Sequence, residues 1–474
     1  MSHKPITITN LSLDFPHKVC FEGFNTQILP GDRIGIIGRN GSGKSSLVKM
    51  LMGEMDPSGG RISGIDNLVV GYVPQTVLEH SELSGGERFN KAFTEALAAQ
   101  PDLLILDEPT NHLDQNVKYS LLRKLDNYQG TLIIVSHDLD VLTNTVDKLW
   151  HIKDGKITVF SGDYNDYMYE NGLALASQQK MLSDLKKEKK KLKIQRQQES
   201  QKAGKAGKKK AKDNDKLGFD AKSDNAQAKA DAKIAKLNER LGNVQSSLQQ
   251  NRLPEEYKLK FNIDNAYVQT GANLVSVSFG ECSYGVHIVL SDVFFSMAPT
   301  DKVSISGNNA SGKTTFIKAI MQNKSVNVSG DWVLPKPSDI GYLEQHYTNL
   351  NPDDTVEEVI RERAPSMDAK AVRKHLNDFL FRKNEEVFAK VKTLSGGEKA
   401  RLSLAQIAAR PPKLLILDEI TNNIDLETKE YIISVLNAYA GAFIIVSHES
   451  GFLDRLNLTN RYFIQNGTLK QKFR

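Results

Sequence analysis

Short apolar segments followed by glycine-rich or charged residues recur along this 474-residue chain. Segments that are apolar on both faces predict buried parallel strands. They include Leu103–Leu106 and Leu132–Val135. Ile34–Ile37 and Val303–Ser306 are predicted as short buried strands that lead into glycine loops. The residues that follow two of these strands and their glycine loops, Ser46–Met52 and Thr315–Met321, predict helices. Strand, loop and helix repeated in this order predict an α/β fold with a mainly parallel sheet.

A different pattern occupies the middle of the chain. Apolar residues there follow a four-three spacing that is typical of a coiled-coil seam, at Ala230, Ile234, Leu237, Leu241, Val244 and Leu248. A weaker stripe, which Lys189 interrupts, precedes it at Leu175, Leu182, Leu185 and Leu192. The residues between the two, 201–226, have no apolar stripe. We therefore expect two antiparallel helices with a basic tip, the first about 45 Å long at 1.5 Å per residue.

The chain also repeats itself. GRNGSGKS at Gly38–Ser45 returns as GNNASGKT at Gly307–Thr314, an offset of 269 residues. GYVPQ, ending at Gln75, returns as GYLEQ, ending at Gln345, an offset of 270. LSGGE, LLILDE and IIVSH all return at an offset of 311. Five motifs in the same order predict two homologous domains on either side of the helical stretch.

The jump in offset locates a difference between the two copies. Nine residues separate Gln75 from Ser84, whereas fifty separate Gln345 from Ser395. In the second copy, DTVEEVIRERA and AKAVRKHLNDFLF predict helices. The first domain thus has a truncated helical subdomain. The domains expected from these patterns are residues 1–170, 171–253 and 254–474.

The G-x-x-x-x-G-K-[ST] motif between a strand and a helix is typical of a phosphate-binding loop, because converging backbone N–H groups and a helix N-terminus attract anions. Lys44 and Lys313 are expected to reach the β- and γ-phosphates of a nucleotide, and Ser45 and Thr314 to ligate Mg²⁺. The other loop residues expected to bind nucleotide are Gly38, Asn40, Gly41, Gly43, Ser46, Gly307, Asn309, Gly312 and Thr315.

Charged residues follow the other apolar strands. Asp107 and Asp418 are expected to hold Mg²⁺ through water, and Glu108 and Glu419 to act on the attacking water as base or orienting group. An acidic pair that caps the next helix is the alternative interpretation. The remaining candidates are Gln75 and Gln345 for Mg²⁺ or the water, and His137 and His448 for the γ-phosphate.

LSGGE offers a second anion-binding surface in each domain, which favours contact with the other domain's nucleotide. With this motif the chain resembles the ATP-binding cassette (ABC) ATPases, everywhere except in the middle stretch. The resemblance implies that two cassettes close head to tail within the chain on two ATP molecules. Ser84, Gly85, Gly86 and Glu87 would then serve the Lys313 site, and Ser395, Gly396, Gly397 and Glu398 the Lys44 site. Phe15 and Tyr284, each 29 residues before a loop lysine, match the adenine-stacking aromatics of the family.

Tandem cassettes with a charged helical linker resemble the ABC-F subfamily, which acts on ribosomes. The resemblance implies binding at the ribosomal E site, with the linker serving as a P-site tRNA interaction motif directed at the tRNA and the peptidyl-transferase centre. DEPTNHLD, Asp107–Asp114, is typical of the subfamily; DEITNNID, Asp418–Asp425, departs from it at Ile420 and Asn423. The short interval before Ser84 leaves no room for the arm that contacts the ribosomal L1 stalk, and it predicts weaker closure of the Lys313 site.

Charge supports a polyanionic partner. Lys186–Lys216 contains fourteen Lys and Arg against four Asp and Glu, a net charge of +10, whereas the whole chain carries +5. Lysines without interleaved aromatics favour phosphate contacts. The candidates for RNA contact are Lys202, Lys205, Lys208, Lys209, Lys210 and Lys212.

Other features bear on location and on rival functions. The longest aliphatic runs, four residues, are far below the roughly 20 that a membrane-spanning helix needs. Two cysteines and an N-terminus without a signal pattern favour a cytoplasmic protein. The resemblance implies an intramolecular pair of cassettes in a monomeric chain. A translation factor and a ribosome-protecting antibiotic-resistance factor both remain open. An ATPase that remodels DNA is the alternative, and an ATPase subunit of a transporter is the least favoured one.

Overall fold

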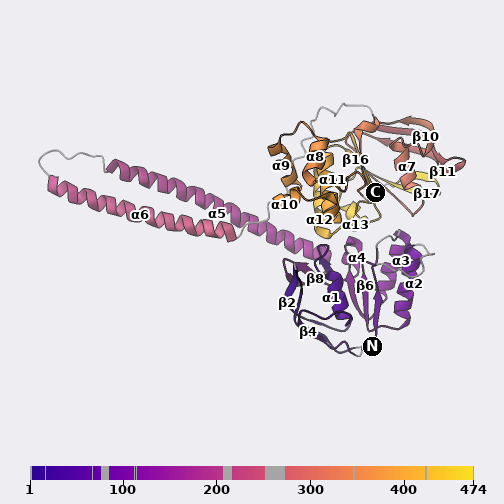
Figure 1. Cartoon of the computed structure of the whole chain (residues 1–474), viewed down its shortest axis with the longest axis horizontal. Helices are drawn as coiled ribbons and strands as arrows, with labels where there is room; N and C mark the ends of the chain where they lie inside the picture. The colour runs from indigo at the N-terminus through magenta and orange to yellow at the C-terminus, as the bar shows by residue number, and fades with distance from the viewer. Residues whose placement is uncertain are drawn as a thin grey trace. The chain divides into compact units, whose positions relative to one another are not determined.

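The computed structural model describes residues 3–16, 18–66, 68–75, 85–110, 113, 115–206, 216–250, 273–344, 347–421 and 424–472. The chain divides into two compact units, one made of Met1–Asn165 with Tyr257–Arg474 and the other of Asp166–Glu256. The first unit contains both copies of the repeated motifs (Figure 1). We call them the first repeat, from β1 to β9, and the second repeat, from β10 to β18.

A six-stranded sheet lies at the centre of the first repeat, in the order β5-β6-β7-β3-β8-β9. All neighbours are parallel except β8 and β9. The strands are β3 (Arg33–Gly38), β5 (Val70–Val73), β6 (Leu103–Asp107), β7 (Thr131–Val135), β8 (Lys148–Lys153) and β9 (Lys156–Ser161). Every residue of β6 and β7 is buried, as their apolar sequences predict.

A smaller antiparallel sheet, in the order β2-β1-β4, completes the first repeat, with β1 (Ile6–Phe15), β2 (Lys18–Ile28) and β4 (Gly59–Ser63). Helix α1 (Lys44–Leu51) packs between the two sheets, since its Leu47 and Leu51 share a core cluster with Ile8 of β1 and Ile34 of β3. The remaining helices are α2 (Gly85–Ala98), α3 (Gln115–Asp126) and α4 (Leu139–Asn144).

The second repeat has the same two sheets, in the orders β14-β15-β16-β12-β17-β18 and β11-β10-β13. Its strands are β10 (Val275–Tyr284), β11 (His287–Met297), β12 (Lys302–Gly307), β13 (Asn327–Val333), β14 (Ile340–Glu344), β15 (Leu414–Asp418), β16 (Ala442–Val446), β17 (Asn460–Gln465) and β18 (Thr468–Lys472). Its helices include α7 (Lys313–Ile320), α12 (Leu426–Ala438) and α13 (Ser450–Asp454). The predicted α/β fold with two cassettes is confirmed.

The helical subdomain of the second repeat contains α8 (Val356–Arg363), α9 (Ala369–Asp378), α10 (Asn384–Val387) and α11 (Gly396–Ala409), with a 3₁₀ turn at Val391–Thr393. Another 3₁₀ turn, Pro337–Asp339, precedes β14. Thr355 starts α8 with a capping box that Glu358 completes, and the Asp368 side chain caps α9. Val356, Val359 and Ile360 bury the inner face of α8. The matching interval of the first repeat, residues 76–84, lies outside the described part of the chain.

Two helices form the second unit, α5 (Tyr164–Ala206) and α6 (Lys216–Gln250), and they lie side by side in Figure 1. Leu192, Leu237, Leu241 and Val244 form a buried cluster with Leu185 and Leu248 packed against it. Helix α5 begins seven residues before the predicted linker boundary and has 43 residues, which corresponds to about 65 Å rather than 45 Å. The side chains of Leu175 and Ala230 lie outside the described residues. Among the helices that are described, none could cross a bilayer.

Leu241→Ala tests whether this seam holds the two linker helices together. Leu241 is 6% exposed at the centre of the cluster, and truncation of a buried leucine costs about 2 to 5 kcal/mol. We expect faster amide hydrogen exchange in α5 and α6 with unchanged ATP binding. Asn238→Ala, on the exposed side of α6, is the matched control. Equal exchange in both variants would contradict the packing.

Candidate functional site

Each phosphate loop depends on glycines whose backbone no other residue adopts easily. Gly43 and Gly312 cap α1 and α7 in the left-handed region, with φ of 100° and 105°. These turns let each helix begin at the lysine, two residues earlier than the sequence predicts. Gly38 and Gly307 pass so close to the neighbouring strand that a Cβ would lie 2.7 Å from the carbonyl oxygen of Ile152 and 2.8 Å from that of Ile464.

The two loop lysines lie in matching positions. The ammonium of Lys44 donates to the carbonyl oxygens of Gly38, at 2.9 Å, and Arg39, at 3.1 Å. Lys313 donates to the carbonyls of Gly307 and Asn308, each at 2.9 Å. A buried cation surrounded by the backbone of a glycine loop, at the start of a helix, can bind phosphate. Burial lowers the pKa of Lys44, although nearby carboxylates oppose this shift.

Strand order brings the carboxylates to the same place. Strands β6, β7 and β3 are parallel neighbours, so Asp107, His137 and the first phosphate loop all lie at one edge of the sheet. Glu108 and Glu419, directly after β6 and β15, have φ of 50° and 51°. A glutamate in the left-handed region is strained, which is common at functional sites. Each is fixed by its backbone N–H, which donates to the carbonyl of Val135 or Val446.

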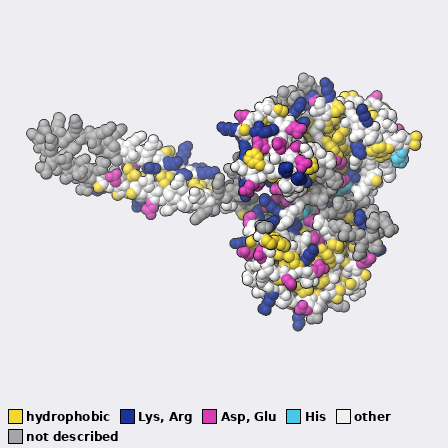
Figure 2. Space-filling view, in the orientation of Figure 1, with side chains coloured by type: hydrophobic (Ala, Val, Ile, Leu, Met, Phe, Trp, Pro, Cys, Tyr) yellow, Lys and Arg dark blue, Asp and Glu magenta, His cyan; other side chains and the backbone are white. Residues whose placement is uncertain are grey.

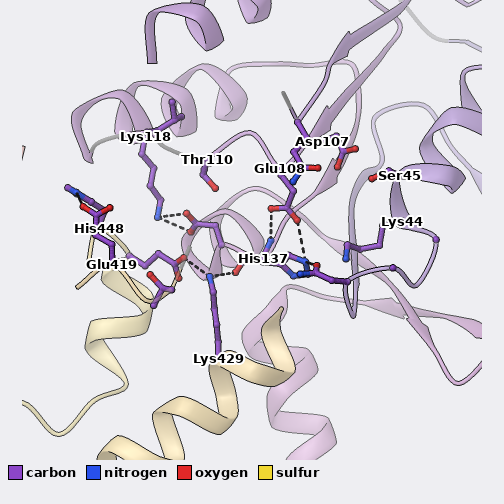
Figure 3. Close-up of a pocket in the computed structure, with 18 of the residues that line it drawn as sticks. Lys44, Ser45, Asp107, Glu108, Thr110, Lys118, His137, Glu419, Lys429 and His448 are labelled. Atoms are coloured by element: carbon purple, nitrogen blue, oxygen red, sulfur yellow. Dashed lines mark hydrogen bonds and ion pairs between the residues drawn. The ribbon is translucent and has the colours of Figure 1, made fainter. Parts of the chain in front are cut away.

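His137 contacts the candidate base. Its Nε2 lies 3.2 Å from Asn40 Oδ1 and 3.4 Å from Glu108 Oε1, while its backbone N–H donates to Glu108 Oε2 at 3.3 Å (Figure 3). Burial, then the charges of Lys44 and Lys429, hold the pKa of His137 well below its usual range. The imidazole is therefore neutral at pH 7, and its two acceptor neighbours favour the Nε2–H tautomer. In the second repeat, His448 Nε2 lies 3.4 Å from Glu419 Oε1.

Burial also affects the carboxyl groups. It raises the pKa of Glu108 to about 7 despite the opposing charges of Lys44 and Lys429. It raises the pKa of Asp107, which a hydrogen bond from Ser45 opposes, and it raises that of Asp418 to about 6. Oδ1 of Asp107 is buried without a hydrogen-bond partner in the described structure. A buried carboxylate oxygen of this kind beside a hydroxyl fits the oxygen ligands that Mg²⁺ prefers.

Most of these candidate side chains line one cavity of about 620 Å³. Candidate residues of the first repeat that line it are Phe15, Asn40, Gly41, Gly43, Lys44, Ser45, Ser46, Gln75, Asp107, Glu108 and His137. Candidate residues of the second repeat that line it are Asn309, Glu419 and His448. Both repeats thus contribute to one hollow, and Glu419 and His448 approach it from the second repeat (Figure 3).

The signature serine of the second repeat lies elsewhere. Ser395 does not line this cavity; it starts α11 with a capping box in which Glu398 takes part. Gly397 packs against α12, where a Cβ would lie 2.7 Å from Thr428 Oγ1. Ser395 as a partner of the Lys44 site therefore stays a prediction.

Other candidate residues fall partly outside the described structure. Gly85, Gly86 and Glu87 form the first turn of α2, and Gly396 that of α11. Thr314 and Thr315 lie in the first turn of α7, and Tyr284 ends β10. Ser84 and Gln345 are outside the described residues, as are Lys208, Lys209, Lys210 and Lys212 and the side chains of Lys202 and Lys205.

Sequence reasoning missed two buried lysines beside the site. Lys118 of α3 pairs with Asp138 and Asp140, and Lys429 of α12 pairs with Glu449. Lys118 and Lys429 are 311 residues apart, as are Asp138 and Glu449. This is the offset of the recognised motifs, so extending the repeat alignment by a few residues finds both pairs.

The second residues of the two phosphate loops also contact the opposite repeat, but in different ways. Arg39 Nε lies 2.5 Å from Glu427 Oε2, and Lys153 Nζ lies 3.0 Å from the other oxygen of Glu427. At the second loop, the Asn116 amide donates to Asn308 Oδ1 at 3.2 Å. An ionic contact at one loop thus corresponds to a neutral hydrogen bond at the other.

Comparison with known proteins identifies the family of this chain. The family described as ABC transporter matches residues 21–76 and 290–422. The ribosome protection protein VmlR of Bacillus subtilis is 30% identical over 98% of this chain and 88% of its own length. The ATP-binding protein Uup of Buchnera aphidicola is 29% identical over 99% of this chain and 82% of its own length. "Probable ATP-binding protein YheS" of Haemophilus influenzae is 28% identical over 99% and 80%. The chain belongs to the ABC-F subfamily of ATP-binding cassette ATPases.

Proposed function

We propose that this protein hydrolyses ATP in order to bind and leave the ribosome. In the ATP-bound state it occupies the E site, and its linker acts on the P-site tRNA and the peptidyl-transferase centre. The main observation behind this proposal is the linker. It consists of two long helices that pack together, and it connects the two repeats in the sequence. VmlR, similar over nearly the whole chain, is named as a ribosome protection protein.

The described part of the linker has the charge that such a role needs. Lysines are exposed along α5 at Lys186, Lys187, Lys190, Lys191 and Lys193, and Lys and Arg side chains gather along the hairpin in Figure 2. Exposed lysines neutralise phosphates without base readout, so they suit RNA of many sequences. The expected RNA contacts at Lys202, Lys205, Lys208, Lys209, Lys210 and Lys212 follow these lysines in the sequence.

The residues at the strand ends support the proposed hydrolysis. Lys44 binds the phosphates of ATP, Glu108 orients the attacking water and accepts its proton, and His137 holds Glu108 while its imidazole approaches the γ-phosphate. Ser45, Asp107 and Gln75 would hold Mg²⁺, which supplies charge neutralisation on the phosphates. Lys313, Thr314, Gln345, Asp418, Glu419 and His448 perform the same roles in the second repeat. Phe15 and Tyr284 stack on the adenine rings of the two nucleotides. The protein acts as a monomer in the cytoplasm.

Glu108→Gln and Glu419→Gln test hydrolysis. A general base contributes about 10²- to 10⁴-fold, so we expect the double variant to lose phosphate release while it still binds ATP. The ionic contact of Arg39 with Glu427 holds the first phosphate loop against the other repeat, whereas the short interval before Ser84 weakens closure of the Lys313 site. The first site should therefore turn over more ATP, and Glu108→Gln should remove more turnover than Glu419→Gln. Equal losses in the two single variants, measured by steady-state phosphate release, would contradict this asymmetry.

Sedimentation of the double variant with ribosomes tests the partner. With ATP we expect the trapped protein in the ribosomal pellet, and with ADP in the supernatant. Replacing Lys208, Lys209, Lys210 and Lys212 by Ala in the same variant should weaken pelleting and reduce its dependence on salt. Protein that stays in the supernatant and binds branched DNA would favour the DNA-remodelling alternative. Recovery in a membrane complex would favour the transporter alternative.

Expression in a sensitive bacterium separates the two ribosomal roles. If the protein is a protection factor, we expect a raised minimum inhibitory concentration for at least one antibiotic that binds the large subunit. The Glu108→Gln/Glu419→Gln variant should give no such increase. Unchanged susceptibility to all ribosomal antibiotics would rule out protection and leave the translation-factor role.

A further inference from the structure

Lys429 is a buried lysine of the second repeat that contacts the catalytic groups of the first. It lies on α12 and is 1% exposed. Its ammonium donates to the carbonyl oxygen of His137 at 2.7 Å and forms an ion pair with Glu449 (Figure 3). Burial of an ammonium is costly unless it is paired and hydrogen-bonded. These two contacts satisfy that requirement, and one of them belongs to the other repeat.

The contacted carbonyl belongs to a residue that also holds the base. The backbone N–H of His137 donates to Glu108 Oε2, and its ring Nε2 lies near both Glu108 and Asn40. Lys429 therefore fixes the third polar group of the same residue. Any displacement of α12 away from the first repeat would free the His137 peptide, and with it the position of the imidazole and of the Glu108 carboxylate.

Lys118, the counterpart of Lys429, acts differently. It donates to Asp138 Oδ1 at 2.8 Å within its own repeat and also pairs with Asp140. Asp140 then accepts hydrogen bonds from Ser450 Oγ, at 2.9 Å, and from the Gly451 backbone N–H, at 2.8 Å. The first repeat thus contacts the second through the Asp140 carboxylate, which binds the start of α13 after His448. The second repeat contacts His137 of the first directly, through the Lys429 ammonium.

We propose that Lys429 is a positioning residue for the first ATP site, supplied by the opposite repeat. It makes hydrolysis by Glu108 depend on contact between the repeats, through the backbone carbonyl of His137. This inference rests on the proposed ATP hydrolysis. It gives a role to α12, which lies outside the recognised motifs. It also adds a reason for unequal activity at the two sites, because Lys118 pairs within its own repeat.

Single-site backgrounds test the proposal. Glu419→Gln leaves turnover to the first site, and Glu108→Gln leaves it to the second. Lys429→Met should lower kcat in the Glu419→Gln background by about tenfold or more, since misplacement by about 1 Å can cost 10²-fold. The KM for ATP should change little. In the Glu108→Gln background the same substitution should lower kcat less than twofold. A comparable loss in both backgrounds would overturn the proposal and indicate a merely structural lysine.

Two further variants protect this test. Lys429→Met leaves the Glu449 carboxylate buried without its partner and could prevent folding. In that case the double variant Lys429→Met/Glu449→Gln, which removes both charges, replaces it in the same kinetic test. Arg455→Met/Glu430→Gln removes the ion pair between Arg455 and Glu430, the residue next to Lys429 on α12, and should affect neither background. Wild-type protein without ATPase activity would overturn both the proposed hydrolysis and this role. Active wild type with equal effects of Lys429→Met would overturn this role alone.

Discussion

Ionic groups buried between two apolar sheets are the constraint on which the rest of the structure depends. Strands β6 and β15 are buried along their whole length, yet each ends at an aspartate and a glutamate. Buried charges persist only if they are paired, hydrogen-bonded or bound to metal. The charges of Lys44 and Lys429 act on Glu108, and that of Lys313 acts on Asp418. Beside them, Lys118 pairs with Asp138 and Lys429 with Glu449. Removing one partner of a buried pair typically costs about 3 to 5 kcal/mol, so these pairs hold in place the side chains through which the repeats contact each other.

The same constraint explains the unusual backbone at the site. Glu108 and Glu419 tolerate the left-handed region because a parallel sheet holds the preceding strand and a hydrogen bond holds the backbone N–H of each glutamate. Gly38 and Gly307 bring each phosphate loop against its neighbouring strand. Strain and close approach therefore occur at equivalent residues in both repeats, which supports a shared chemistry rather than a chance resemblance of loops.

The sequence was sufficient for the parts that local chemistry determines. Apolar runs predicted the buried strands, the G-x-x-x-x-G-K-[ST] motif located the phosphate loops, and a four-three spacing found Leu237, Leu241 and Val244 of the linker seam. It placed the starts of α1 and α7 two residues late, because the left-handed turn at Gly43 and Gly312 lets the lysine itself begin the helix. It missed Lys118 and Lys429, because a lysine on an amphipathic helix is usually solvated and only tertiary packing buries it.

The central claim is that two joined ATP sites control how the helical linker engages the ribosome. A cryo-electron microscopy map of the Glu108→Gln/Glu419→Gln variant bound to ribosomes with ATP tests it most directly. We expect density for ATP at both Lys44 and Lys313, Ser395 facing the first nucleotide, and the tip between α5 and α6 beside the P-site tRNA. A complex in which the linker points away from the tRNA, or ribosomes without bound protein, would contradict the claim.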